Sequence, residues 1–157
     1  MKFNTDGFSA SDWLRAEIVR RFAISRPCQT SKHWKRKTFD SNDLTNLFDG
    51  KKPDEFQEYI NEVRYCGQPT EISREKILPD VRLTRDYSDT EVAILCLEQQ
   101  WVGFTYWDGG GRHGSPESIP WIEHAYLLNA TEKEVVIEET IIKRIFSLTN
   151  PTAHPAP

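Results

Sequence analysis

The segment from Trp101 to Gly114 constrains the fold more than any other, because it joins an alternating aromatic run to a glycine-rich loop. In a β-strand, successive side chains point to opposite faces. One face would carry Val102, Phe104 and Tyr106, and the other would carry Trp101, Gly103, Thr105 and Trp107. The glycines that follow allow backbone conformations that other residues avoid. The pattern therefore predicts a strand that ends in a loop, and loops on rigid strands often carry function.

Helical patterns occupy the first part of the chain. Residues 11–22 carry Leu14, Ile18 and Phe22 at helical spacing, and Ser9 or Ser11 can serve as the N-cap. A shorter helix is predicted over 42–48 with Ser41 as its cap, and the polar stretch 28–39 reads as a loop or a short strand. A third helix begins with Pro53 in its first turn, and its apolar stripe is Phe56, Ile60 and Val63.

Extended patterns occupy the second part. Residues 92–97 form a continuous apolar run, which is typical of a strand covered on both faces. Residues 122–128 and 135–146 are further candidate strands, the second with a bulge where its alternation slips. Helices followed by strands predict an α+β fold, with N-terminal helices followed by an antiparallel β-meander of about four strands.

The length favours one domain. We expect it to span residues 1–148, with a helical part over about 1–79 and a sheet part over about 80–148. The proline-containing tail, 149–157, has no core residue and is expected to be disordered.

The glycine loop is the main candidate for a functional site. Successive glycines can turn backbone N–H groups toward an anion, and Arg112 can hold a phosphate or carboxylate with two hydrogen bonds. The spacing matches neither a Walker loop nor a dinucleotide fingerprint, so anion binding and a plain connection both stay open. We predict a partner-binding surface made of Tyr106, Trp107, Asp108, Gly109, Gly110, Gly111, Arg112, His113 and Glu117.

Acids and histidines around this loop are the candidates for metal binding or acid–base catalysis. They are Asp108, His113, Glu117, Glu123 and His124. Their spacing does not match a helical zinc site, and neighbours on the predicted strand 122–128, such as Glu123 and His124, point to opposite faces. The chain also lacks a Gly-x-Ser-x-Gly nucleophile motif. We therefore predict no catalytic residue, no metal and no cofactor.

Charge is distributed unevenly along the chain. The net charge is −4, but residues 12–37 carry +6 and residues 38–157 carry −10. The basic segment can meet nucleic acid or an acidic partner, or it can pack against acids of its own chain. The corresponding contact residues are Lys32, His33, Trp34, Lys35, Arg36 and Lys37, where Trp34 either stacks on a base or packs inside the protein.

Composition also bears on location. No apolar run has the length of a membrane span, and the first residues lack a hydrophobic signal region. The three cysteines, Cys28, Cys66 and Cys96, show no paired spacing and are expected to be reduced thiols. We expect a cytoplasmic protein that contacts no membrane.

The block that starts Trp101-Val-Gly-Phe-Thr-Tyr-Trp and continues through Gly114 to Trp121 resembles a segment of small uncharacterised proteins of bacterial phages, plasmids and integrative elements. The resemblance covers residues 98–128 and the hairpin after them, about a quarter of the chain, and leaves out the helical part. It implies a mobile-element setting and no particular activity, so no residue role is transferred.

Three hypotheses follow. The first is a non-enzymatic binding protein that contacts a host protein complex, such as a defence or nucleic-acid-processing machine, through its aromatic residues. The second is a nucleic-acid-binding accessory or regulatory protein that uses residues 31–37. The third is a small metal-assisted hydrolase or transferase that uses the glycine loop. The surplus of aromatic residues favours the first, because aromatic side chains anchor many interfaces.

Overall fold

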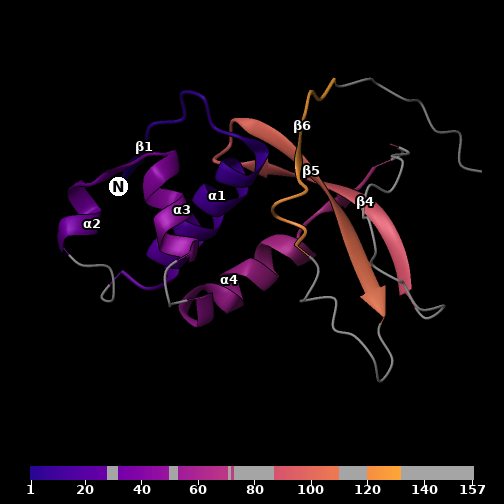
Figure 1. The fold of residues 1–157 in the computed structure, drawn as a ribbon, viewed down its shortest axis with the longest axis horizontal. Coiled ribbons are helices and arrows are strands. Elements are labelled where there is room, and N and C mark those ends of the chain that lie inside the picture. Colours follow the sequence, from indigo (N-terminus) through magenta and orange to yellow (C-terminus); the bar gives the residue numbers. More distant parts are fainter. Residues whose placement is uncertain (28–31, 50–52, 71, 73–86, 110–119, 132–157) are drawn as a thin grey trace, which may run out of the picture.

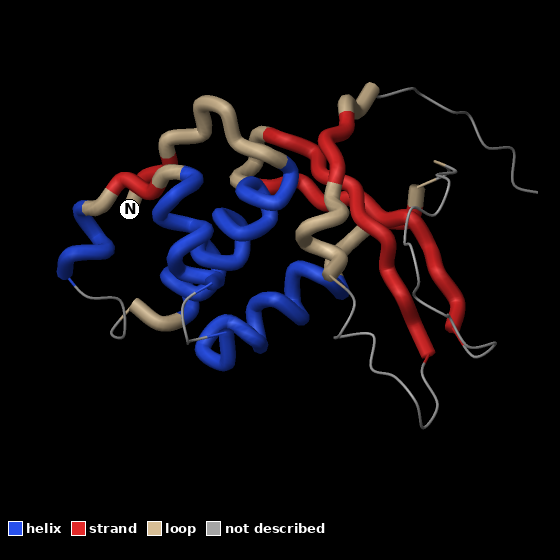
Figure 2. The backbone as a smooth tube through the Cα atoms, in the orientation of Figure 1, coloured by secondary structure: helices blue, strands red, loops and turns tan. Residues whose placement is uncertain are grey.

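The structure is a computed structural model, and it describes residues 1–27, 32–49, 53–70, 72, 87–109 and 120–131. Helices lie together beside a twisted sheet (Figures 1 and 2). This arrangement confirms the predicted α+β fold with helices before an antiparallel sheet. In chain order the elements are β1 (Lys2–Phe3), α1 (Ala10–Ser25), α2 (Lys32–Arg36), β2 (Thr38–Phe39), α3 (Ser41–Asp49), α4 (Pro53–Tyr65), β3 (Gln68–Pro69), β4 (Tyr87–Cys96), β5 (Gln100–Gly109) and β6 (Tyr126–Leu128).

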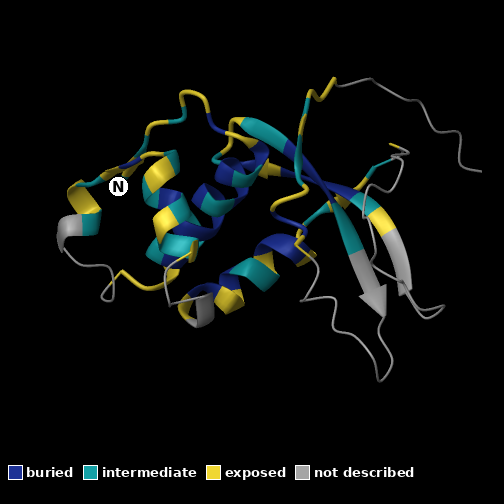
Figure 3. Cartoon of the chain, viewed as in Figure 1, coloured by how far each residue is buried: buried dark blue, intermediate teal, exposed yellow. Residues whose placement is uncertain are grey.

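Helix α1 is the centre of the packing. Ser9 caps it in a capping box with Asp12, whose carboxylate accepts hydrogen bonds from the Ser9 N–H and hydroxyl at 3.0 and 2.7 Å. The helix ends at Ser25, because the residue before Pro27 is disfavoured in helical conformation. Leu14 and Ile18 are buried as predicted, but so are residues on the other sides of α1 (Figure 3). The amphipathic prediction was therefore too narrow, since α3, α4 and the sheet all pack against this helix.

Two details of the smaller helices differ from the predictions. Asp40, rather than Ser41, precedes α3 and caps it, because its carboxylate accepts the Asp43 N–H at 2.9 Å. The buried stripe of α4 contains Tyr59 beside Phe56 and Val63, whereas the predicted Ile60 is only partly buried. The helices form one core with the sheet. Within this core Phe22 joins α1 to α4 through edge contacts with the rings of Phe56 and Tyr59, at 5.1 and 5.5 Å between centroids.

The sheet is a four-stranded antiparallel meander in the order β3-β4-β5-β6. Strand β3 was not predicted, because Pro69 reads as a breaker; at a sheet edge, however, proline loses no necessary N–H. Strands β4 and β5 pair from Tyr87↔Gly109 to Cys96↔Gln100. Of the predicted strand 122–128 only the last residues, β6, are extended, so its beginning was wrong: the chain there forms a turn.

The side chains of β5 alternate between the two faces of the sheet as predicted, and the structure shows which of these faces packs on the core. Val102 and Phe104 are fully buried against the helices. The apolar run on β4 predicted a strand covered on both faces, but the face turned away from the helices is covered only in part. On that face Ala93 is buried, whereas Leu95 is 37% exposed. A sheet with helices on one side leaves such a position open.

A tight turn of Leu97, Glu98 and Gln99 connects β4 to β5. Leu97 and Glu98 have φ of 50° and 58°, a backbone conformation that residues other than glycine adopt at a cost of about 1–2 kcal/mol each. The Gln99 N–H closes the turn on the Cys96 carbonyl at 3.0 Å. Leu97 thus belongs to the turn, and the predicted strand was one residue too long at this end.

A second, small sheet joins the N-terminal segment to the basic segment. Strands β1 and β2 are parallel, with Lys2↔Thr38 and Phe3↔Phe39 in register. Phe39 is buried, and its ring packs edge-on against Trp34 of α2 at 5.3 Å. The candidate strand 135–146, the tail and the proposed domain limit at residue 148 lie outside the described residues.

Candidate partner-binding site

Tyr106 lies where the core-facing side of β5 passes the end of α4. It follows Phe104 on that side of the strand, but the last turn of α4 covers it only in part. Its ring meets the Tyr65 ring edge-on, at 5.9 Å between centroids and 63° between planes. The Arg64 guanidinium lies over both rings, 5.3 Å from Tyr106 and 5.9 Å from Tyr65. We call these three residues the Tyr–Arg cluster.

The members of the Tyr–Arg cluster differ in exposure. Arg64 is 4% exposed and Tyr106 is partly buried, whereas Tyr65 is 64% exposed. Contacts between a guanidinium and aromatic faces, and edge-on contacts between rings, are favourable and restrict the rings. An exposed tyrosine is therefore held in place by buried neighbours, and little rotamer entropy remains to be lost when a partner covers it.

The structure places only one end of the predicted loop surface. Tyr106 is part of the Tyr–Arg cluster, and the backbone of Trp107, Asp108 and Gly109 continues β5, paired with Asp89, Ser88 and Tyr87. The remaining predicted residues of this surface, Gly110, Gly111, Arg112, His113 and Glu117, lie outside the described residues. The strand before the loop is thus confirmed, and the surface remains a prediction.

Sequence reasoning missed Arg64 and Tyr65. They follow the apolar stripe of α4 directly, where a helix end reads as a solvated surface. A tyrosine and an arginine at the last turn of a helix give no signal of their own. Their proximity to Tyr106 depends on how α4 packs against β5, which only the tertiary structure shows.

The second predicted contact surface, residues 32–37 around Trp34, does not present the Trp34 ring for stacking on a base. Residues 32–36 form helix α2 and not a loop or strand, so that part of the prediction was wrong. The Trp34 ring lies 5.3 Å from Phe39, 5.9 Å from Phe22 and 6.5 Å from Phe56. Trp34 is therefore partly buried and packs against rings of its own chain, which favours the packing alternative of the two that its sequence context left open. Lys35 and Arg36 are exposed, and the side chains of Lys32 and His33 are not described.

Most cations of the basic segment pair with acids of the same chain. Arg20 and Arg21 bind Glu17, at 2.7 and 2.9 Å. Further pairs join Arg15 to Asp12 and Glu123, Arg26 to Glu58, and Lys37 to Asp43. The intramolecular alternative therefore accounts for five of the basic side chains of residues 12–37.

Glu17 is the most buried member of these pairs. It is 1% exposed, and its carboxylate also accepts the Leu97 N–H at 3.1 Å. Burial by itself would raise the pKa of Glu17, but the hydrogen bonds from Arg20, Arg21 and Leu97 outweigh burial and lower it. Glu17 therefore carries its charge in the core and ties α1 to the strained turn between β4 and β5.

The candidates for catalysis do not assemble among the residues that the structure describes. Glu123 and His124 lie in a turn and are both exposed, so the prediction that they point to opposite faces of a strand was wrong. Within the described ranges no group of three His, Cys, Asp or Glu side chains can hold a metal ion. His113 and Glu117 fall outside those ranges, and the side chain of Asp108 is not described.

The two described cysteines differ in chemistry. Cys96 is buried, and burial together with the charge of Glu17 raises the pKa of its thiol to about 12. Cys66 is exposed, with the Arg21 guanidinium 3.5 Å from its sulfur. Neither forms a disulfide in this structure. Cys28 lies outside the described residues.

No known protein family matches the chain, and comparison with curated proteins and with solved structures also finds no match. Among the helices that the structure describes, none is both long enough and apolar enough to cross a membrane.

Proposed function

We propose that this chain is a non-enzymatic binding protein of a phage or other mobile element, which acts in the cytoplasm by contacting a host protein complex. In this proposal it inhibits a defence or nucleic-acid-processing machine of the host. The mobile-element setting comes from the resemblance of residues 98–128. The observation that carries the binding function is the Tyr–Arg cluster.

The cluster has the composition of an interface anchor. Tyrosine and arginine are enriched among the residues that dominate binding energy, and such anchors are often surrounded by contacts that contribute little. Tyr65 presents a large ring to solvent, while Tyr106 and Arg64 fix its position from below. The cluster also adjoins the strand that leads into the predicted glycine loop, so both can contribute to one surface.

The test compares capture of a partner by three forms of the protein. Tagged wild type, Tyr65→Ala and Tyr65→Phe are incubated with bacterial host lysate, with and without nuclease, and bound proteins are identified by mass spectrometry. Tyr65→Phe is the matched control, because it keeps the ring and its contact with Tyr106. We expect a stoichiometric protein that survives nuclease, retained by Tyr65→Phe and reduced about tenfold by Tyr65→Ala.

Two outcomes would contradict this proposal. Equal capture by wild type and Tyr65→Ala would show that the cluster is not the anchor. Capture that disappears with nuclease would favour nucleic-acid binding instead. Because Tyr65 is 64% exposed, both variants should fold, although Tyr65→Ala loses the ring contacts with Arg64 and Tyr106, and a melting curve checks that they are folded.

A further inference from the structure

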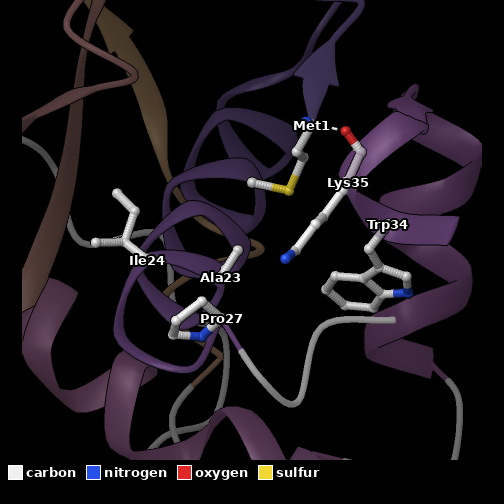
Figure 4. A pocket seen from close by; sticks show the side chains of 6 residues that line it. All are labelled: Met1, Ala23, Ile24, Pro27, Trp34 and Lys35. Atoms are coloured by element: carbon white, nitrogen blue, oxygen red, sulfur yellow. Dashed lines mark hydrogen bonds between the residues drawn. The ribbon is translucent and has the colours of Figure 1, made fainter. Parts of the chain in front are cut away.

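A pocket lies at the other end of α1 from the sheet, between this helix and α2. It has a volume of about 220 Å³ and is lined by Met1, Ala23, Ile24, Pro27, Trp34 and Lys35 (Figure 4). All but one of these side chains are apolar, and Ile24 is 64% exposed at its rim. The volume is below the range of roughly 300–1,000 Å³ typical of small-molecule sites, yet a cavity of about 150 Å³ can hold a benzene ring. The pocket is therefore of a size for one apolar side chain.

Positive charge accompanies this apolar surface. The Lys35 side chain extends across the pocket, with its ammonium between Ala23 and Trp34 in the view of Figure 4. Arg36 follows it, and both residues are exposed. Neither forms an ion pair with any residue of the described ranges, whereas five other cations of residues 12–37 do. Among the described cations of residues 12–37, the two without an ion pair are thus Lys35, which lines the pocket, and its neighbour Arg36.

Contacts within the chain hold two sides of the pocket in place. Trp34 is fixed by ring contacts to Phe22 and Phe39, so it presents a constant surface. The Met1 nitrogen donates a hydrogen bond to the Lys35 carbonyl at 2.7 Å, which holds the N-terminal segment against α2. A preformed pocket saves a partner the cost of ordering it.

From this combination we propose that the pocket binds an apolar side chain within an acidic segment of a partner protein. The side chain packs in the pocket against Ile24 and Trp34, and flanking carboxylates meet Lys35 and Arg36. This inference rests on the proposed protein-binding function but concerns a surface separate from the Tyr–Arg cluster. Its test uses synthetic peptides, so its failure and a failure of lysate capture are distinguishable.

The chain has a single methionine, which makes the test direct. Protein labelled with ¹³C at the methionine methyl gives one NMR signal, and that signal reports on the pocket. It is titrated with an acidic heptapeptide that has one central phenylalanine. Matched peptides carry alanine at the centre, or lysine in place of the acidic residues. A single-stranded oligothymidine serves as the nucleic-acid probe.

We expect the acidic phenylalanine peptide to shift the Met1 signal saturably, and the other two peptides to bind at least about tenfold more weakly. Lys35→Glu and Ile24→Ala should each weaken the first peptide by about tenfold, while Leu127→Ala, which alters an exposed side chain on β6, should not. All three positions are exposed, so the variants should fold, and their melting curves confirm it.

Three results would overturn this inference. The Met1 signal could stay unmoved by the phenylalanine peptide up to about 1 mM. The alanine peptide could bind as tightly, which would show attraction by charge alone. The oligothymidine could shift the signal while the peptide does not, which would assign this surface to nucleic acid.

Discussion

Two carboxylates hold the same sheet from opposite sides, and they do so by different means. Glu17 reaches it from the helical side, where it is fully buried and accepts hydrogen bonds from two arginines and the Leu97 N–H. Glu91 lies on the face turned away from the core, where it is half-buried. Its partners are neutral: the Thr105 hydroxyl donates at 2.8 Å, and the Tyr126 hydroxyl donates to the other oxygen.

The difference shows how solvent access decides which partners a carboxylate needs. A charge taken fully out of water is costly unless opposite charges and hydrogen bonds compensate it, and Glu17 has both. A carboxylate at a wet surface keeps part of its hydration, so hydroxyl groups suffice for Glu91. Glu17 therefore contributes a charge network to the core, and Glu91 contributes alignment of β4, β5 and β6.

The largest effect should come from Glu17→Gln. The neutral amide would leave Arg20 and Arg21 without their carboxylate and weaken the contact to the strained turn at Leu97. Removing one partner of a buried ion pair costs about 3–5 kcal/mol, and we expect about 3 kcal/mol here because both arginines reach water. Urea unfolding measures the change. Glu58→Gln, which alters an exposed carboxylate paired with Arg26, is the control and should leave stability nearly unchanged.

The pH dependence of wild type and Glu17→Gln sharpens the same point. Because the fold lowers the pKa of Glu17 below 4.5, its contribution is complete above that pH and is lost as the pH falls through the folded-state pKa. The stability difference between the two proteins should therefore be constant near neutral pH and shrink below pH 4.5. A difference that stays constant down to acid unfolding would show that the charge of Glu17 is not what stabilises the fold.

A smaller effect is expected on the outer face from Gly103→Ala. A Cβ at this position would overlap the ring of Tyr126, which crosses Gly103 between β5 and β6. Overpacking of this kind costs about 1–3 kcal/mol, and we expect about 2 kcal/mol by urea unfolding. Tyr126→Ala added to Gly103→Ala should remove the overlap, so the loss in the double variant should be less than the sum of the two single losses.

Gly7 provides the matched control for that cycle. Gly7→Ala is strained by its φ of 73°, and nothing lies within 4 Å of the added Cβ. Tyr126→Ala should therefore not rescue Gly7→Ala. Full additivity at Gly103 would contradict the packing role of Tyr126.

The smallest effect should follow from Tyr126→Phe. The ring would still cover Gly103, but the Glu91 oxygen would lose its hydroxyl donor. A hydrogen bond to a half-exposed carboxylate contributes about 1 kcal/mol, well below the expected loss for Glu17→Gln. Thermal unfolding can compare the two variants directly. If Tyr126→Phe lost as much folding stability as Glu17→Gln, the expectation that Glu17 stabilises the fold more than Glu91 would be wrong.

Local patterns predicted the elements but not their partners. The spacing of Leu14, Ile18 and Phe22 was enough to identify α1, and the alternation of residues 101–107 was enough to identify β5. Neither pattern shows that α1 is buried on several sides, because that depends on α3, α4 and the sheet meeting around it. The two-residue strands β1 and β3 were missed for the same reason: so few residues carry no period.

The candidate site shows the same limit. The sequence singled out Tyr106 from its place before the glycine loop, but Arg64 and Tyr65 join it only through the packing of α4 on β5. The sequence likewise left two roles for Trp34, and the ring contacts with Phe22 and Phe39 decided between them.

By itself, the sequence determined the longer periodic elements, α1, α4 and β5, and the order of helices before strands, because these depend on side-chain spacing between near neighbours. It offered candidates for the helix caps, and at α3 the cap is Asp40 rather than the predicted Ser41. Only the tertiary structure decided which charges are neutralised within the chain and which aromatic rings remain exposed. The contact of Glu17 with Leu97 and that of Tyr65 with Tyr106 join residues far apart in sequence. Their energies depend on burial, and burial exists only after the elements have packed.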